Sequence, residues 1–163
     1  MATDPEVVKA LKNIPWFAEL KPEHFNRMVE AAVMRHVRAG EELFKEGDKE
    51  DCFYVVIEGR VALSIFVPHR GKVRIDTAEP MDLIGWSVAT PVVRQRTASA
   101  TVVQPGRLVA FDAEKIRQMC EEDHDFGYLF MRRVANIIAG RLMATRLQLL
   151  DMFENPALEN PNA

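Results

Sequence analysis

The stretch AGEELFKEGDKEDCFYVVIEGRVAL, residues 39–63, decides the fold class. Its apolar runs are short and rich in Val, Phe and Tyr, and polar segments that contain Gly40, Gly47 and Gly59 punctuate them. Apolar runs of this kind are typical of β-strands, and glycine adopts the positive φ of tight turns at little steric cost. The stretch therefore predicts short strands joined by tight turns.

The same strand and turn signals continue from this stretch to Asp112. Further strands are predicted at VALSIFV, VRIDTAEP, TASATVVQ and RLVAFD, and the turns between them contain Gly71 and Gly106. Before the stretch, the alternating segment VMRHV, residues 33–37, marks the first strand. Strands that recur about every 8 to 12 residues, with few helices between them, indicate an antiparallel sandwich or jelly roll.

Helices are predicted on both sides of the strand region. Asp4 and Pro5 suit the N-cap and first position of a helix that Pro15 ends. A second helix begins at about Pro22. After the strands, Asp112 suits the N-cap of the helix AEKIRQMCEED. The fold class is therefore mainly β with flanking helices.

A long helix is predicted from about residue 125 to residue 153. Its apolar positions are Leu129, Phe130, Val134, Ile137, Ile138, Leu142, Leu147, Leu149 and Leu150. These positions cover more than one narrow stripe, so one surface packs on the β-domain and the other requires a second cover. We expect a homodimer through residues 125–153, and a helix buried wholly within one chain is the alternative. The domain is expected to span residues 1–153, followed by a flexible tail at 154–163.

The composition is that of a soluble globular protein. Hydrophobic residues make up 48% of the 163 residues, charged residues make up 28%, and the formal net charge is −3. This mild acidity argues against nucleic acid as the main partner. No apolar run reaches the roughly 18 residues of a membrane helix, and MATDPEVVKA lacks the apolar core of a secretory signal. We therefore expect a cytoplasmic protein without a membrane partner.

Motifs of metal binding and catalysis are missing from the sequence. Cys52 and Cys120 form no CxxC pair, and the four histidines lack HxxxH or HExxH spacing, so no metal site is expected. The sequence also contains no P-loop, no GxGxxG, no nucleophile elbow and no paired-carboxylate motif. An enzyme is therefore the least favoured class, and no catalytic residue is predicted.

Four segments together carry a resemblance to a known family. They are IPWFAEL, the glycine-punctuated stretch 39–63, the loop IGWSVATPVVRQRTASA at 84–100, and the long final helix. Over about residues 10 to 150 the chain resembles the cyclic nucleotide-binding domain family, in particular the sensor half of catabolite activator-type bacterial regulators. The resemblance implies an antiparallel β-roll, also called a double-stranded β-helix or jelly roll, with N-terminal helices and a long C-terminal dimerisation helix.

The resemblance implies that the loop 84–100 holds a cyclic phosphate. Gly85 matches the glycine that opens the family's binding loop. The backbone N–H groups of a helical turn at Ser87 to Ala89, which includes Val88, would supply an anion site, and the Ser87 hydroxyl would add a donor.

The arginine of the family's loop follows the glycine by about eleven residues, and Arg96, Thr97 and Ala98 keep that spacing. A guanidinium meets the two oxygens of a cyclic phosphodiester with a planar pair of charge-assisted hydrogen bonds. Arg94 is the alternative phosphate contact, because side chains two apart in an extended strand point to one face.

The sugar half of the site departs from the family's pattern. Trp86 stands where the family has a Glu that accepts hydrogen bonds from the ribose 2′-hydroxyl, and an indole cannot accept that bond. An unpaired hydroxyl costs about 1 to 3 kcal/mol. The indole either packs on the ligand as a platform or plugs the pocket. Aligning Ala139 to Leu142 with the family's helix places Thr145 where a Thr meets the purine amino group from across the dimer, and an exposed Thr without a ligand is the alternative.

These observations favour a stand-alone, non-catalytic sensor of a purine cyclic mononucleotide such as cyclic AMP or cyclic GMP. Complete regulators of this type carry a helix-turn-helix domain beyond the long helix, whereas only a short tail follows Asp151. We therefore expect no direct sequence-specific DNA binding, and a downstream protein of unknown identity. Two alternatives stay open: a dimeric interaction or scaffold protein that has lost the nucleotide, and a sensor of another small anion.

Overall fold

The computed structural model describes residues 3–90 and 92–154. The N-terminal helices are α1 (Pro5–Lys12), α2 (Pro15–Ala18) and α3 (Pro22–Glu30). The strands are β1 (Ala32–Val37), β2 (Glu42–Phe44), β3 (Cys52–Val67), β4 (Gly71–Ala78), β5 (Leu83–Ile84) and β6 (Ser99–Asp112). A 3₁₀ helix, η1 (Trp86–Ala89), lies between β5 and β6, and α4 (Ala113–Glu122) and α5 (His124–Glu154) follow the strands.

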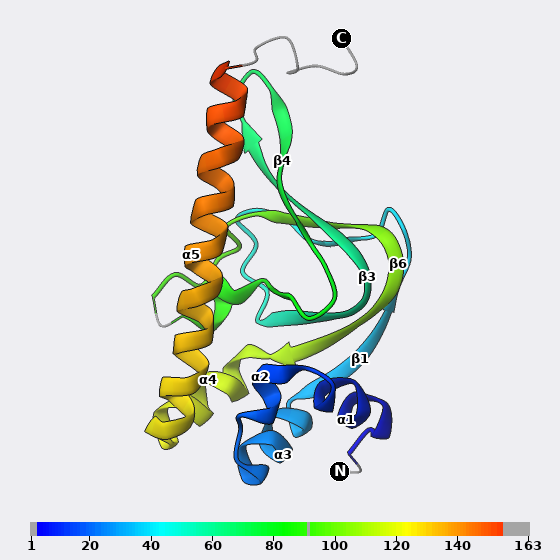
Figure 1. The fold of residues 1–163 in the computed structure, drawn as a ribbon, viewed down its shortest axis with the longest axis vertical. Coiled ribbons are helices and arrows are strands. Elements are labelled where there is room, and N and C mark those ends of the chain that lie inside the picture. The colour runs from blue at the N-terminus through cyan, green and yellow to red at the C-terminus, as the bar shows by residue number, and fades with distance from the viewer. Residues whose placement is uncertain (1–2, 91, 155–163) are drawn as a thin grey trace.

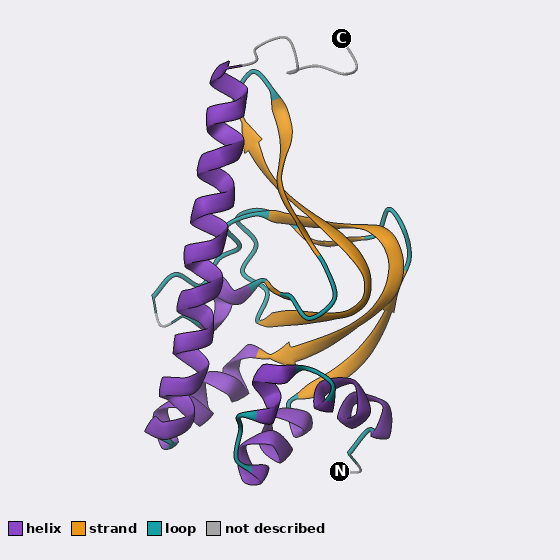
Figure 2. Ribbon diagram, in the orientation of Figure 1, coloured by secondary structure: helices purple, strands orange, loops and turns teal. Residues whose placement is uncertain are grey.

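The strands form one antiparallel sheet that curls into a roll. The order is β1-β6-β3-β4, with β2 paired to β6 and β5 paired to β3. The central pair, β3 and β6, runs from Cys52 opposite Asp112 to Ser64 opposite Ser99. In Figure 2 these long strands curve strongly, α1 to α3 lie at one end, and α5 runs alongside the sheet. The predicted fold class, an antiparallel β-roll with flanking helices, is confirmed.

The turns predicted at Gly59 and Gly106 were wrong, because β3 and β6 pass through these glycines without interruption. Gly59 has a φ of 91°, and the pairing of the two strands changes register on both sides of it. A Cβ built on Gly106 would overlap the backbone of Glu58. The two glycines therefore permit a close backbone approach where the sheet bends, which is a usual role of glycine inside a strand.

Proline starts helices as well as ending them in the N-terminal region. Pro15 ends the run after α1, as predicted, but it is also the first residue of α2. Proline suits this first position because its fixed φ is helical and its missing N–H has no partner to lose there. The predicted caps are confirmed: Asp4 accepts from the N–H of Glu6 at 2.9 Å, and Asp112 accepts from that of Lys115 at 3.2 Å.

Two hydrophobic clusters lie on opposite faces of β3. Phe53 and Val55 pack in the cluster under the helices, whereas Tyr54 and Val56 pack in the cluster inside the roll. Side chains alternate between the faces of a strand, so a strand buried on both faces must be apolar at every position. This explains the continuous apolar run in β3. The cluster inside the roll forms the base on which the candidate site rests.

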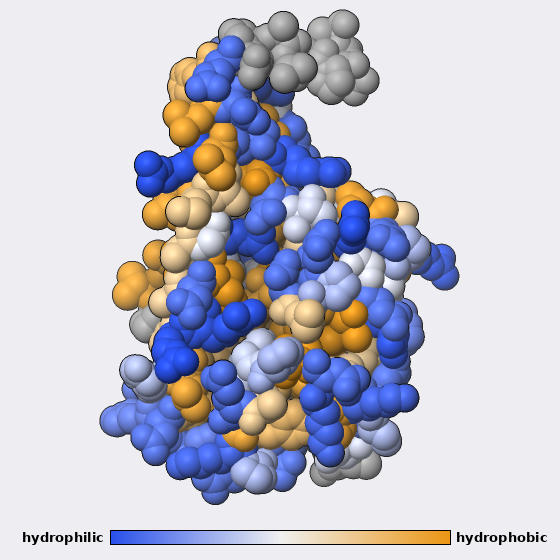
Figure 3. Space-filling model, in the orientation of Figure 1, coloured by the Kyte–Doolittle hydropathy of each residue, from blue (hydrophilic) through white to orange (hydrophobic). Residues whose placement is uncertain are grey.

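The two halves of α5 have different surroundings. The helix buries Phe126, Phe130 and Val134, all in its first half. Its second half carries exposed apolar side chains, among them Leu147 at 63% and Phe153 at 79%. Figure 1 places this half beside β4, and Figure 3 shows hydrophobic residues along the outer side of the helix. The expected tail, residues 154–163, lies outside the described residues apart from Glu154, the last residue of α5.

Candidate functional site

A pocket of about 280 Å³ lies between the β-roll and the second half of α5. Strand side chains, the loop after β5 and the helix all contribute to its lining. The lining residues are Phe44, Leu63, Ile65, Ile75, Ile84, Gly85, Trp86, Ser87, Arg96, Thr97, Ala98, Ile138, Arg141, Leu142 and Thr145. The structure thus brings together every sequence-predicted site residue except Val88.

Arg96 is the buried cation of this pocket, with only 1% of its surface exposed. Its Nη1 donates to the carbonyl of Gly85 at 2.9 Å, and its Nη2 donates to the carbonyl of Cys52. The guanidinium carbon lies 4.1 Å from the centroid of the Phe44 ring, which adds a cation–π contact. Its Nε has no hydrogen-bond partner within the protein.

Arg96 forms no ion pair with a carboxylate in the part of the chain that the structure describes, and Asp51, the carboxylate whose pKa its charge helps to lower, is paired with Arg117. Its partners are neutral carbonyls and an aromatic ring. A buried charge without a counter-ion is costly, and such charges are normally paired. The pocket is therefore electrostatically suited to an anion.

The alternative phosphate contact, Arg94, points elsewhere. Residues 92–98 are not an extended strand, because β6 begins only at Ser99, so the premise that both arginines share a face was wrong. Arg94 is exposed and lines a separate surface pocket with Glu114. Arg96 is instead anchored by its backbone: its N–H donates to the carbonyl of Asp48 at 2.8 Å, and its carbonyl accepts from Gly47 at 2.8 Å. The preference for Arg96 over Arg94 on spacing thus agrees with the geometry.

Gly85 leaves the space that the guanidinium of Arg96 occupies. The residue is left-handed, with φ 73° and ψ 21°, and η1 begins directly after it. A Cβ at this position would overlap Nη1 of Arg96. A glycine is therefore required both by the backbone conformation and by the arginine that packs on it.

Ser87 and Trp86 form neighbouring parts of the wall. Ser87 is buried, and its hydroxyl has no hydrogen-bond partner within the protein. Trp86 is half-buried and packs against the core cluster under the helices while also lining the pocket. The indole thus forms one wall of the pocket and does not fill it, and its role as a platform for a ligand stays a prediction.

Val88 and Thr145 differ from what the family's pattern implied. Val88 is 1% exposed in the core, its carbonyl accepts from Nη1 of Arg117 at 2.6 Å, and its side chain is not part of the pocket lining. That its backbone N–H contributes to an anion site stays a prediction. Thr145 lines the pocket of its own chain, whereas the family's pattern placed it across a dimer.

The sequence did not identify Asp76 as the partner of Arg141 in an ion pair at the edge of the pocket. Arg141 of α5 lines the pocket and pairs with Asp76 of β4. The two residues are 65 positions apart. Nothing in the strand pattern around Asp76 distinguishes it from a solvated carboxylate, and only the packing of α5 along β4 identifies its partner.

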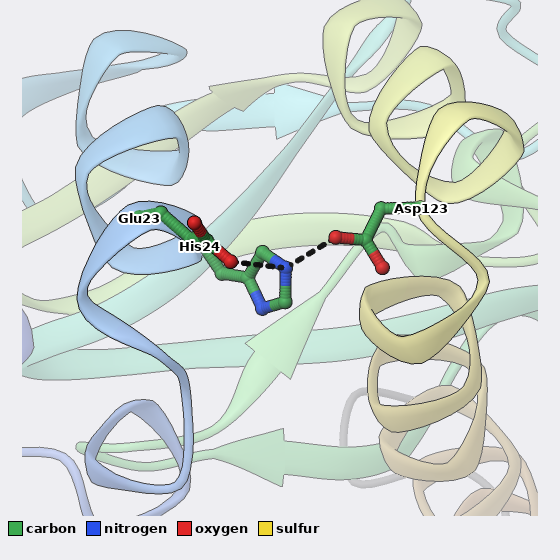
Figure 4. Close-up of side chains that lie close together, drawn as sticks. All are labelled: Glu23, His24 and Asp123. Carbon is green, nitrogen blue, oxygen red and sulfur yellow. Dashed lines mark hydrogen bonds and ion pairs between the residues drawn. The ribbon is translucent and has the colours of Figure 1, made fainter.

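A second cluster of titratable groups, shown in Figure 4, lies at the start of α5. Nε2 of His24 lies 2.6 Å from Oδ2 of Asp123 and 3.9 Å from Oε1 of Glu23. The other Asp123 oxygen accepts from the N–H groups of Asp125 and Phe126, so it caps α5. The hydrogen bond from His24 lowers the pKa of the Asp123 carboxyl.

By donor type, the cluster of Glu23, His24 and Asp123 could hold a metal ion. The oxygens of Asp123 are already engaged, however, one by His24 and the other by the helix cap. We therefore interpret this cluster as a tether that fixes the first turn of α5 to α3.

The chain belongs to the cyclic nucleotide-binding domain family, because the family's model matches residues 34–123, more than half of the chain. This family is one of regulatory ligand-binding domains. The pocket and the unbalanced arginine described above lie between the roll and α5, and most of the lining residues fall inside the matched range.

Two curated proteins and one solved structure are similar to this chain. The chain is 28% identical to a Drosophila melanogaster cAMP-dependent protein kinase type II regulatory subunit over 113 residues, which cover 69% of this chain and 28% of that protein. It is 27% identical to a CRP-like cAMP-activated global transcriptional regulator of Mycobacterium tuberculosis over 115 residues, or 70% of this chain and 49% of the regulator. A cyclic nucleotide-binding domain from Methylobacillus flagellatus KT shares the fold, with a TM-score of 0.72 at 17% identity over 89% of this chain and 81% of that one.

The chain thus spans less than half the length of the two curated relatives. Among the described helices, none combines the length and the apolar character that crossing a bilayer requires.

Proposed function

We propose that this chain is a non-catalytic regulatory sensor that binds a cyclic mononucleotide in the pocket between the roll and α5. The observation that carries the proposal is that two residues lining one pocket, Arg96 and Ser87, each carry a buried donor, Nε and Oγ, without a partner within the protein. Buried polar groups are almost always hydrogen-bonded, so two such donors on residues that line one cavity call for an acceptor from a ligand.

The charge of the pocket supports the same conclusion. Arg96 has no carboxylate partner in the described chain, and a cyclic phosphodiester carries one delocalised negative charge. Membership of the cyclic nucleotide-binding domain family, and two relatives whose names state regulation by cAMP, support a cyclic nucleotide as the anion.

The rest of the lining suits the body of such a ligand. Most of the remaining side chains are apolar, and Trp86 offers an aromatic surface on which a sugar or base packs. The volume of about 280 Å³ lies just below the range of roughly 300 to 1,000 Å³ that is usual for small-molecule sites. A compact ligand, such as a single cyclic nucleotide, fits this volume class. Thr145, which also lines the pocket, would contact the purine.

The long helix α5 transmits ligand binding to a partner through a change in the conformation of its second half. Its first half is anchored in the core, whereas Ile138, Leu142 and Thr145 of its second half line the pocket. A ligand shifts a conformational equilibrium only through a difference in its affinity for the two states, and contacts with these residues provide that difference. We further propose that the exposed apolar side of this half forms a homodimer through residues 125–153 in the cytoplasm, and that a downstream protein reads the helix.

Calorimetry with cyclic AMP and cyclic GMP tests the proposal on the wild type and Arg96→Gln. The glutamine is shorter and neutral, so it removes the charge from the pocket, and binding should weaken about tenfold to a hundredfold. Arg94→Gln is the matched control, because it removes the same charge from an exposed position and should bind as the wild type does. No heat from either nucleotide at about 1 mM with wild-type protein would overturn the proposal.

One observation favours a second function, a dimeric interaction protein. The exposed side chains Leu142, Leu147, Leu150 and Phe153 make the second half of α5 a surface suited to protein contact. This function predicts a stable assembly that no cyclic nucleotide stabilises thermally. Nucleotide binding that appears only in Trp86→Glu, where a carboxylate acceptor has been restored, would favour it over the sensor. A thermal shift with other small monoanions alone would point to a sensor of another anion.

A further inference from the structure

The described lining of the pocket contains two guanidinium groups, those of Arg96 and Arg141, and no carboxylate. Arg96 has no charged partner there, whereas Arg141 pairs with Asp76, which lies just outside the lining. One arginine is therefore balanced and the other is not. The pocket presents one net positive charge to whatever enters it.

A β-bulge explains how Asp76 reaches the helix. Leu63 pairs with Asp76 and Ser64 pairs with Arg74, so Ile75 is an extra residue on β4. An extra residue of this kind re-aims the side chains beside it. Ile75 lines the pocket, and its neighbour Asp76 contacts the arginine of α5.

A backbone hydrogen bond and partial burial stabilise the Asp76–Arg141 pair. Oδ1 of Asp76 accepts from the N–H of Thr77 at 2.7 Å, while Oδ2 meets Nη1 of Arg141. The side chains are 34% and 16% exposed, so water screens the pair only in part. While the pair persists, the carboxylate of Asp76 offsets most of the attraction of Arg141 for an anionic ligand.

We propose that Asp76 is a specificity-determining residue that restricts this pocket to monoanions. The inference rests on the proposed function, because it concerns the charge of the same ligand. A phosphodiester or a carboxylate carries one charge, which Arg96 alone balances. A phosphate monoester carries a charge of about −1.5 to −2 at pH 7. In the described lining, the cation left to bind its second charge is Arg141, but Arg141 is already paired with Asp76.

The test compares 5′-AMP with its methyl phosphodiester, since these two probes share a body and differ by one charge. Calorimetry on the wild type should show tighter binding of the methyl ester. In Asp76→Asn, Arg141 is released, and the ratio of AMP affinity to ester affinity should rise about tenfold or more, the effect of one added charge-assisted contact. The near-isosteric amide keeps the volume and one carbonyl oxygen, so the fold should be preserved.

Two further variants act as controls. Glu79→Gln removes the same charge from an exposed pair with Arg60, outside the pocket lining, and should leave the ratio at its wild-type value. The double variant Asp76→Asn with Arg141→Gln neutralises both partners, so the net charge returns to that of Arg96 alone. Its ratio should fall back to the wild-type value.

The outcomes separate the two ideas. If the wild type binds the ester and Asp76→Asn leaves the ratio unchanged, this inference is overturned while the sensor function stands. An equal weakening of both probes would mean that the ion pair only holds the helix, which also overturns it. If the wild type binds neither these probes nor a cyclic nucleotide, the sensor function fails and this inference fails with it.

Discussion

Replacing Gly85 by alanine tests the central geometry of the site. A left-handed φ of 73° costs an alanine about 1 to 2 kcal/mol. The new Cβ would also overlap Nη1 of Arg96 and lie 3.3 Å from both its Cζ and Cε1 of Phe44, so the guanidinium must move. Moving it breaks the 2.9 Å bond to the Gly85 carbonyl, and a hydrogen bond from a charged group contributes about 1.5 to 3 kcal/mol. The free energy of unfolding should therefore fall by about 2.5 to 5 kcal/mol.

The chain provides a control that isolates the displacement of Arg96. Gly40 has a φ of 85°, and nothing lies within 4 Å of a Cβ built on it. Gly40→Ala should therefore lose only the backbone contribution, about 1 to 2 kcal/mol. Urea denaturation followed by circular dichroism measures both variants, and calorimetry measures ligand binding. Equal losses of stability in Gly85→Ala and Gly40→Ala would refute the claim that Arg96 packs against this glycine.

Two other predictions concern the capping and the tether of the C-terminal helices. Asp112→Ala removes the side-chain acceptor of the Lys115 N–H at the start of α4 and should lower the free energy of unfolding by about 1 kcal/mol in urea denaturation, whereas Asp112→Asn should retain most of it. The pKa of Asp123 is lowered in the folded protein, mainly by the hydrogen bond from His24. The ionised carboxylate therefore stabilises the folded protein fully above the unfolded pKa of about 3.9. This stabilisation is lost as the pH falls through the lower pKa of the folded state. The difference in urea midpoint between wild type and Asp123→Asn should thus be full at pH 6 and shrink below about pH 4, and a difference that is constant with pH would contradict the tether.

Local signals predicted much of the fold correctly. The caps at Asp4 and Asp112 and the extent of α5 depend on side chains a few residues away, which a sequence displays directly. The turn predictions at Gly59 and Gly106 failed for a complementary reason. Glycine indicates that a side chain is not tolerated, but the same signal arises from a turn and from two strands that approach closely where a sheet bends.

The site shows the same division. Gly85 and Arg96 were selected because their spacing of eleven residues matches the loop of the family that the chain resembles, and the structure brings them into contact. Arg94 stayed an alternative because an extended strand was assumed, whereas contacts with the distant turn at Gly47 and Asp48 orient residue 96 inward. Val88 was included for the backbone N–H of its turn, and only packing decided that its side chain is buried in the core.

The sequence by itself determined the alternation of strands and turns, the helix caps, and the arginine paired with a glycine of the binding loop. Each of these depends on chemistry within a short span of chain or on a fixed spacing. Only the tertiary structure decided that Arg96 is buried without a counter-ion, that Trp86 forms a wall beside a hollow pocket, and that Asp76 balances Arg141 from 65 residues away. These features depend on how the sheet curls and where α5 lies along it, and charges distant in sequence meet only after that curvature has formed.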